Sequence, residues 1–140
     1  EQNGRDTAEI WNNGRLDLID KVVAPDYVRH DPAYPDEVRG PGGYRQYVQA
    51  MLAPFPDGAV IVHDLIISPA GDKAVLRYTW EATHAGEFMG IPPTGKKIAL
   101  EAICILSAKD GKLVECWDGY DSLSVLRQLG VELVPKATAD

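Results

Sequence analysis

The segment "VECWDGYDSLSVLRQLG" (114–130) carries two carboxylates, Asp118 and Asp121, only three residues apart. Apolar and aromatic residues surround Asp118 in a strand-like pattern, whereas Asp121 stands directly before a helical pattern. The carboxylate of Asp121 can accept hydrogen bonds from the free N–H groups of the first helical turn, which predicts a structural role as a helix cap. Asp118 has no such use, so it is the first candidate for chemistry.

A hairpin argument indicates what surrounds Asp118. The strand patterns at 96–108 and 112–120 are joined by "KDG", and a three-residue loop there pairs Ala102 with Asp118. A two-residue loop at Asp110-Gly111 pairs Asp118 with Ile103 instead, and its surroundings stay apolar. In the three-residue register, the face that holds Asp118 also holds Leu100, Ala102, Cys104, Leu106, Val114, Cys116 and Tyr120.

Two interpretations of Asp118 follow from this position. Apolar surroundings disfavour the charged form and raise the pKa, so that the carboxyl group can both take and return a proton near neutral pH. Replacing it with Asn then removes a buried charge, and stability is expected to hold or rise. Alternatively, Asp118 reaches water at the strand end or pairs with an arginine such as Arg29, Arg45 or Arg77.

Two histidines are further acid/base candidates. His30, in "VRHDP", could line a cavity mouth or hydrogen-bond locally beside Asp31. His84 follows Trp80 and Ala82 on one strand face, where it could donate to a carbonyl group or be a satisfied histidine at a strand end. No pair of histidines has the i, i+4 spacing of metal ligands, so no metal is predicted.

The elements that position these residues follow from hydrophobic periodicity. Helices followed by an antiparallel meander describe an α+β domain, in which a curved sheet wraps around the N-terminal helices and encloses a pocket. Residues 26–32 form a short extended piece. The predicted helices are 1–15, 16–23, 40–55 and 122–129, and the predicted strands are 59–68, 73–84, 96–108 and 112–120.

The composition favours one globular domain over residues 1–140. The net charge is −7 and the acidic residues are spread along the chain, which argues against a nucleic-acid partner. No apolar run approaches the roughly 18 residues that span a bilayer. No signal-peptide pattern opens the sequence, so a cytoplasmic protein with reduced thiols at Cys104 and Cys116 is expected. Nucleotide and metal motifs are not found, and no cofactor is predicted.

Three stretches carry a resemblance to the SnoaL-like polyketide cyclases of the NTF2-like superfamily: "WNNGRLDLIDKVVAPDYVRHDP" (11–32), "THAGEFMGIPPTGKK" (83–97) and "DGKLVECWDGYDSLSVLRQLG" (110–130). The resemblance implies a cone of curved antiparallel sheet closed by N-terminal helices, usually a homodimer. It also implies intramolecular aldol condensation of an aromatic polyketide ester without metal or organic cofactor. The acid/base aspartate of the family falls on Asp118.

The same resemblance leaves alternatives open. A characterised cyclase places a histidine where this chain has Cys104. Relatives with this fold include hydroxylases, epoxide hydrolases and dehydratases, and some NTF2-like domains only bind a ligand. The sequence therefore predicts a cofactor-independent cyclase, with a hydrolase, dehydratase, hydroxylase or non-catalytic binding module as alternatives.

The predicted site combines these residues. Asp118, His84 and His30 are the catalytic candidates, and the ligand is a small apolar or aromatic carbonyl compound. The second predicted partner is another copy of the chain, because the last hairpin points Ile103, Ile105, Leu113 and Trp117 outward. The residues expected to line an apolar pocket are Trp11, Tyr27, Tyr47, Met51, Trp80, Phe88, Cys104 and Tyr120.

Overall fold

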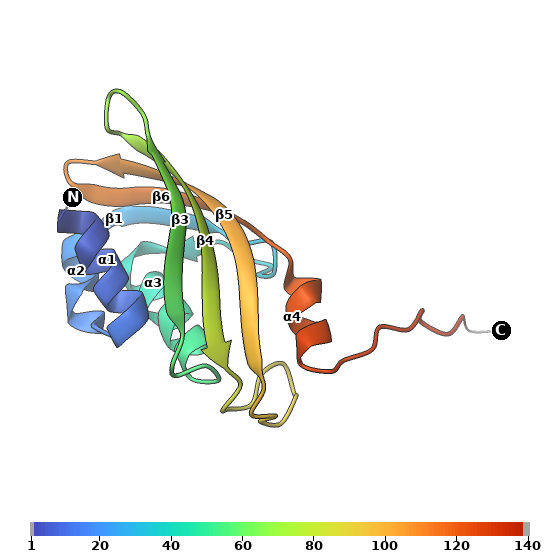
Figure 1. Ribbon diagram of the computed structural model, residues 1–140. Helices are drawn as coiled ribbons and strands as arrows, with labels where there is room; N and C mark the ends of the chain where they lie inside the picture. The colour runs from blue at the N-terminus through green and yellow to red at the C-terminus, as the bar shows by residue number, and fades with distance from the viewer. Residues whose placement is uncertain (1, 139–140) are drawn as a thin grey trace.

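Helices cover one side of a curved sheet in the computed structural model, which describes residues 2–138. The N-terminal helices come first along the chain, and α4 (Ser122–Gln128) follows the last strand at one end of the sheet (Figure 1). None of the helices within 2–138 combines the length and apolar character of a membrane span. The N-terminal helical elements are α1 (Gln2–Asn13), the 3-10 turn η1 (Leu16–Leu18), α2 (Ile19–Val22) and α3 (Gly40–Leu52).

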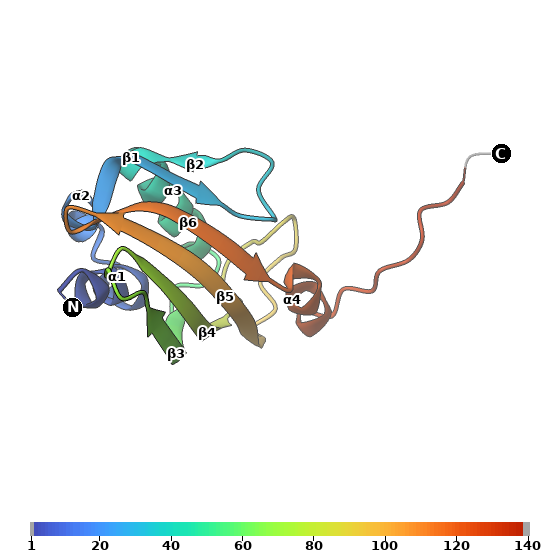
Figure 2. The same ribbon diagram turned by 90° about the horizontal axis from the view of Figure 1, so that it is seen from above.

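The six strands form one mixed sheet in the order β2-β1-β6-β5-β4-β3. The strands are β1 (Val23–His30), β2 (Val38–Arg39), β3 (Ala59–Ile67), β4 (Lys73–Thr83), β5 (Lys97–Lys109) and β6 (Lys112–Tyr120). The predicted meander is confirmed for β3 to β6, which pair antiparallel in sequence order. The sequence did not indicate that β1 lies parallel to β6, beside which it runs in Figure 2.

The hairpin that carries Asp118 differs from both registers considered above. Asp110 and Gly111 form a two-residue turn with φ of 51° and 75°, the left-handed conformations that type I′ turns require. The pairing starts at Lys109 with Lys112 and shifts by one residue at a bulge between Ser107 and Ala108. Asp118 is therefore paired with Cys104, on the face predicted for it.

The bulge corrects one expectation about the outer face. Leu113 pairs with Ala108 and Glu115 pairs with Ser107, which leaves Val114 as the extra residue. Leu113 consequently points inward and is buried, whereas a regular ladder would have turned it outward. Ile103, Ile105 and Trp117 remain exposed, so the outer face is apolar without Leu113.

Two apolar clusters fill the space under the sheet. The first lies between the N-terminal helices and strands β1 and β6, and includes Ile10, Tyr27, Val48 and Cys116. The second is formed by Phe55 together with residues of β4, β5, α4 and the C-cap of α4: Trp80, Ala82, Ile98, Leu100, Val125 and Leu129. The two clusters lie at opposite ends of the inner side of the sheet, and Asp118 lies next to the first cluster.

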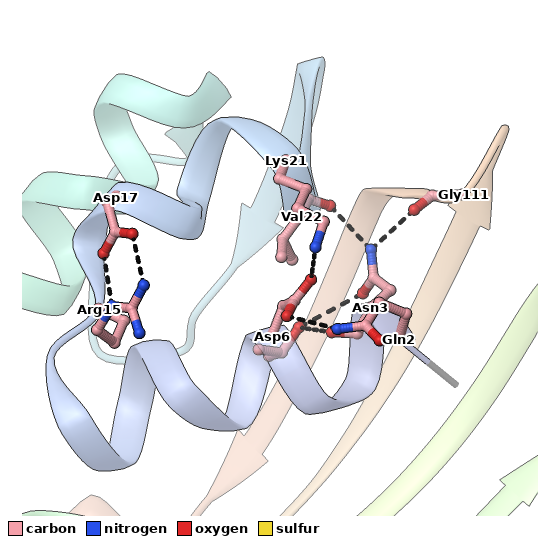
Figure 3. A network of polar contacts seen from close by, with 9 residues as sticks. Gln2, Asn3, Asp6, Arg15, Asp17, Lys21, Val22 and Gly111 are labelled. Atoms are coloured by element: carbon pink, nitrogen blue, oxygen red, sulfur yellow. Dashed lines mark hydrogen bonds and ion pairs between the residues drawn. The ribbon is translucent and has the colours of Figure 1, made fainter.

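Polar contacts fix α1 against the neighbouring elements (Figure 3). The side-chain amide of Asn3 donates to the carbonyl oxygens of Val22 (3.2 Å) and Gly111 (2.9 Å), and so joins α1 to both α2 and the β5–β6 turn. Lys21 Nζ lies 2.6 Å from a carboxylate oxygen of Asp6. These contacts hold the helix that carries Trp11 over the sheet.

The capping role predicted for Asp121 is confirmed. One oxygen of its carboxylate accepts a hydrogen bond from the backbone N–H of Ser124 at 3.0 Å, and α4 begins at the next residue. Asp121 is exposed, in contrast to Asp118. The two acids of the opening motif therefore have different surroundings.

The close approach of Gly58 to Trp80 yields a stability prediction. A Cβ on Gly58 would lie 2.6 Å from the indole ring of Trp80, which the second cluster holds in place. Gly58→Ala should therefore lower the free energy of unfolding by about 1–3 kcal/mol, measured by chemical denaturation. Gly42→Ala is the matched control: it meets nothing within 4 Å in the first turn of α3, and should be neutral or gain up to about 1 kcal/mol. Equal stability of the two variants would contradict this packing.

Candidate functional site

The candidate site lies where β1 and β6 run side by side. Their parallel register pairs Arg29 with Cys116 and His30 with Trp117. Cys116 is buried and Trp117 is 53% exposed, so Arg29 faces the interior and His30 faces the outer side of the sheet. Strand alternation therefore separates these two neighbouring residues, and it is the arginine that meets Asp118.

Arg29 and Asp118 form a buried ion pair. A terminal guanidinium nitrogen of Arg29 contacts Oδ2 of Asp118, and the two side chains are 9% and 1% exposed. The Cys116 thiol donates to Oδ1 of Asp118, with a sulfur–oxygen distance of 3.7 Å. Burial raises the pKa of Asp118 above its ordinary value, while the positive charge of Arg29 opposes the rise and the negative charge of Asp31 adds to it. Both interpretations of Asp118 thus apply in part, because it is buried and also paired.

Asp31, directly after β1, places a second carboxylate beside this pair. Its side chain accepts hydrogen bonds from the hydroxyl groups of Tyr47 on α3 and Tyr120 on β6, and from the backbone N–H of Ala33 at 2.8 Å. Asp31 is 7% exposed. Three donors on one buried carboxylate fix its position, and they join β1, β6 and α3 at the site.

Aromatic rings cover the guanidinium of Arg29. The central carbon of the guanidinium lies 4.4 Å from the centre of the Tyr47 ring and 5.8 Å from that of Trp11, within cation–π range. The indole N–H of Trp11 donates to the hydroxyl of Tyr44 at 2.9 Å. Tyr27 is buried in the same cluster, and its hydroxyl has no hydrogen-bond partner among residues 2–138. Five predicted pocket residues gather around the ion pair: Trp11, Tyr27, Tyr47, Cys104 and Tyr120.

His30 lies away from Asp118, on the other side of the sheet. Its ring stacks on Trp117 with centroids 3.7 Å apart and planes inclined by 18°. Nε2 lies 3.1 Å from a carboxylate oxygen of Glu115, and Nδ1 lies 3.4 Å from one of Glu37. The side chains of His30 and Asp118 therefore point to opposite faces of the sheet, although both residues border one open cleft, as expected for His30 at a cavity mouth.

His84 belongs to the second cluster. It is fully buried, and its Nδ1 accepts a hydrogen bond from the backbone N–H of Thr94 at 3.2 Å. The ring lies 5.6 Å from that of Phe55, which also packs against Trp80 and Phe88. Met51 packs against the same cluster. Four predicted site residues, His84, Met51, Trp80 and Phe88, thus gather at the opposite end of the inner side from the ion pair.

An open cleft of about 320 Å³ reaches the edge of the site. Asp31 and Asp118 border it, together with residues of the segment that follows β1 and two outer-face residues: Pro32, Tyr34, Pro35, Asp36, Glu37, His30 and Trp117. Because the side chain of Asp118 is nearly inaccessible, a ligand in this cleft reaches the ion pair only if the covering side chains move.

Cys104, Cys116 and Asp118 could be considered as metal ligands, since their ligand atoms lie within 4.8 Å of one another. Both cysteines are buried free thiols. A hydrogen bond with Cys104 and burial raise the pKa of the Cys116 thiol, which disfavours the thiolate that a metal needs. Arg29 also occupies the carboxylate of Asp118. Neither Cys116 nor Asp118 is thus readily available as an anionic ligand, and the set fits a resident cation poorly.

The sequence named Arg29 only as one of three possible ion-pair partners of Asp118, a pairing that the structure confirms, and Asp31 was not considered as a site residue. The alternation of "YVRHD" contained the signal, because a buried Tyr27 places Arg29 and Asp31 on the inner face and His30 on the outer one. What the sequence could not provide was the pairing of this strand with β6, which brings the arginine to Asp118.

Comparison with known proteins gives one family. The profile of the SnoaL-like polyketide cyclase family matches residues 4–129. Nogalonic acid methyl ester cyclase of Streptomyces nogalater is 28% identical over 120 residues, which cover 86% of this chain and 89% of the relative. An aklanonic acid methyl ester cyclase of Streptomyces galilaeus is 28% identical over 126 residues, with 90% and 87% covered.

Solved structures give the same result. IdmH of Streptomyces antibioticus has a TM-score of 0.77 and 32% identity, with 94% of this chain and 100% of that chain covered. AclR of Streptomyces galilaeus, named as a candidate hydroxylase, has a TM-score of 0.80 and 32% identity, with 96% and 83% covered. The similarity in sequence and fold extends over the whole region that carries the ion pair.

The ion pair yields an asymmetric stability prediction. Asp118→Asn leaves a buried guanidinium without its anion, and should cost about 3–5 kcal/mol, contrary to the expectation from the sequence. Arg29→Met should cost less at low pH, because an unpaired carboxylate can take up a proton whereas a guanidinium cannot lose one. Its cost should grow as the pH rises through the raised pKa of Asp118, since only the charged form is penalised.

Denaturation of both single variants and of the double variant Arg29→Met/Asp118→Asn, at several pH values, measures the coupling. The double variant should be more stable than Asp118→Asn, because it buries no unpaired charge. Additive losses, or a pH-independent cost in Arg29→Met, would argue against a buried ion pair.

Proposed function

The chain belongs to the SnoaL-like polyketide cyclase family, and we propose that it closes a ring by intramolecular aldol condensation without a cofactor, with Asp118 as acid and base. The observation that carries this proposal is the buried carboxylate of Asp118, held by Arg29 at the position where the family resemblance puts the acid/base residue. The aldol reaction needs one group that can accept a proton from carbon and return it to oxygen.

The proposed reaction has three steps, all within one substrate molecule. The Asp118 carboxylate removes a proton from a carbon next to a carbonyl group, and the electrons of that C–H bond form the enolate. The enolate carbon attacks a second carbonyl carbon, which forms the ring C–C bond and leaves an alkoxide. The protonated Asp118 returns its proton to this alkoxide, so the carboxylate is restored.

The surroundings of Asp118 and Asp31 favour Asp118 as the base. Burial raises the pKa of Asp118, which strengthens it as a proton acceptor. The oxygens of Asp31 are instead occupied by two tyrosine hydroxyls and a backbone N–H, which fix this carboxylate in place and leave it less free to approach a substrate. His30 and His84 have no part in the proposed step, because their contacts lie on the outer face and in the second cluster.

The cleft beside Asp31 and Asp118 is the proposed route of the substrate. Its prolines and its Tyr34 and Trp117 rings offer flat apolar surfaces, and its volume of about 320 Å³ is at the lower end for small-molecule sites. Carboxylates around it, including Asp36 and Glu37, repel an anionic ligand. We therefore propose a neutral aromatic carbonyl compound as the substrate, such as the methyl esters named for the two curated relatives.

A ligand-binding module without chemistry is the weaker alternative. Two charges removed from water cost several kcal/mol each, and an apolar binding pocket gains nothing from them. The similarity to AclR supports a hydroxylase as a further alternative function, and a buried base would also serve such a reaction. Cys104, where a characterised cyclase places a histidine, is the position at which this chain is expected to differ in substrate.

The outer face of the sheet supports a second proposal, that the protein is a homodimer. Exposed apolar side chains from β3, β5 and β6 share this face: Ile61, Ile66, Ile103, Ile105 and Trp117. A shallow cleft of about 370 Å³ on the face is bordered by Arg77, Glu101 and Ile103. A second copy would bury these side chains against an identical surface.

The acid/base role gives a prediction for the pH profile. Turnover requires the charged form of Asp118, so kcat/KM should fall toward low pH, with a midpoint above the 3.8 of an ordinary aspartate. Asp31→Asn removes a neighbouring negative charge and should move this midpoint down. Asp118→Asn should lower kcat by about 10²–10⁴-fold, whereas Asp121→Asn, which keeps a helix cap, should stay near the wild-type rate.

The assay would follow ring closure of nogalonic acid methyl ester and aklanonic acid methyl ester, the compounds in the names of the relatives. Wild-type turnover by a folded Asp118→Asn variant would refute the role of Asp118. An acid-side midpoint that is unchanged in Asp31→Asn would refute the electrostatic link between the two carboxylates.

The dimer proposal predicts a solution behaviour. Sedimentation should show a dimer at micromolar concentration, and Ile103→Glu should produce monomers, because it would bury an unpaired charge in the interface. Ile67→Glu is the control, since Ile67 is similarly exposed but points to the opposite side of the sheet. A wild-type monomer, or a dimer that survives Ile103→Glu, would contradict the proposed face.

A further inference from the structure

Arg29 has donor capacity that its contact with Asp118 does not use. The guanidinium carries five N–H groups in a planar fork. A terminal nitrogen holds Asp118, while Nε is buried and has no hydrogen-bond partner among the residues that the structure describes. An unsatisfied donor on a buried cation is energetically costly. In a site for carbonyl chemistry, such a donor can form a hydrogen bond with a second anionic oxygen.

The charge balance of the proposed reaction indicates which oxygen this is. When Asp118 takes a proton from the substrate, it becomes neutral and its negative charge passes to the enolate oxygen. Arg29 stays positive throughout, because its guanidinium cannot lose a proton in this range. A buried cation whose anion has just been neutralised will attract the new anion strongly in a site from which water is excluded.

We propose that Arg29 is a catalytic residue that binds the enolate oxygen, so that proton transfer moves the negative charge from one partner of the guanidinium to another. This inference rests on the proposed function and adds a second residue to it. The C–H bond breaks, its proton goes to a carboxylate oxygen of Asp118, and the carbonyl oxygen that gains the electron pair accepts hydrogen bonds from Arg29. The substrate class is therefore a ketone or ester whose carbonyl oxygen can reach the arginine.

The groups around Arg29 fit this role. The Tyr47 ring lies against the guanidinium and limits its movement. The Trp11 ring also lies within cation–π range of the guanidinium. Asp31, the other charged group near the pair, is held by its own three donors. The remaining titratable groups near the pair are two thiols and six tyrosines, and burial raises the pKa of every one of these tyrosines, which keeps them neutral. They are Cys104, Cys116, Tyr27, Tyr34, Tyr44, Tyr47, Tyr78 and Tyr120. No second cation is among these neighbours, so Arg29 is the group that can neutralise an enolate.

The proposal can be tested without turnover, by using 4-nitrophenol as an oxyanion probe. In Asp118→Asn the guanidinium lacks its anion, so it should bind the phenolate form of the probe. The visible absorption of the phenolate should show that bound probe is ionised at least about tenfold more in Asp118→Asn than in Arg29→Met/Asp118→Asn. Wild-type protein should resemble the double variant, because its own carboxylate already occupies the arginine.

Thermal unfolding is the second readout, and it still tests the proposal if Asp118→Asn folds poorly. The probe should raise the unfolding midpoint of Asp118→Asn, or restore its folding, and leave the double variant unchanged. Equal ionisation in the two variants, no binding to Asp118→Asn, or no stabilisation by the probe would overturn the role of Arg29. The role of Asp118 as base would fail separately, in the turnover assay, so the two ideas are distinguishable.

Discussion

A guanidinium and a carboxylate that are both removed from water impose the strictest condition on this fold. Each buried charge costs several kcal/mol, and the attraction between them offsets that cost only when the geometry is good and the remaining polar atoms find partners. Arg29 and Asp118 come from strands at opposite ends of the chain. Their meeting requires that β1 lie beside β6 in parallel, with Arg29 paired to Cys116.

The same condition explains why the two apolar clusters differ. Around the ion pair, tyrosines, Trp11 and two cysteines join the aliphatic side chains of the first cluster, because aromatic faces and hydroxyl groups can interact with a cation and a carboxylate. Around Phe55, apolar side chains dominate. The second cluster stabilises the end of the sheet that lies against α4, and the first one keeps two charges in position.

Much of the fold could be predicted from the sequence, because the β-branched runs and the turn signals belong to local structure. The predicted inward orientation of Asp118 was correct although the predicted register was wrong, since the predicted partner Ala102 and the actual partner Cys104 point to the same side. The predicted outward orientation of Leu113 was wrong because a bulge has no clear sequence signal. The ion pair depends on pairing between distant strands, which hydrophobic periodicity cannot reveal, and for that reason His30 attracted the functional interpretation and Arg29 did not.

Asp118 and Asp121 show how one residue type acquires two roles within a few positions. Strand alternation points Asp118 and Tyr120 inward, and the chain then turns into α4 at Asp121. The oxygens of Asp121 meet a backbone N–H and solvent, and its charge stabilises a helix end. Those of Asp118 meet a thiol and a guanidinium whose Nε has no hydrogen-bond partner within residues 2–138. In the proposed reaction, the fixed cation beside Asp118 can stabilise the negative charge on either side of the proton transfer.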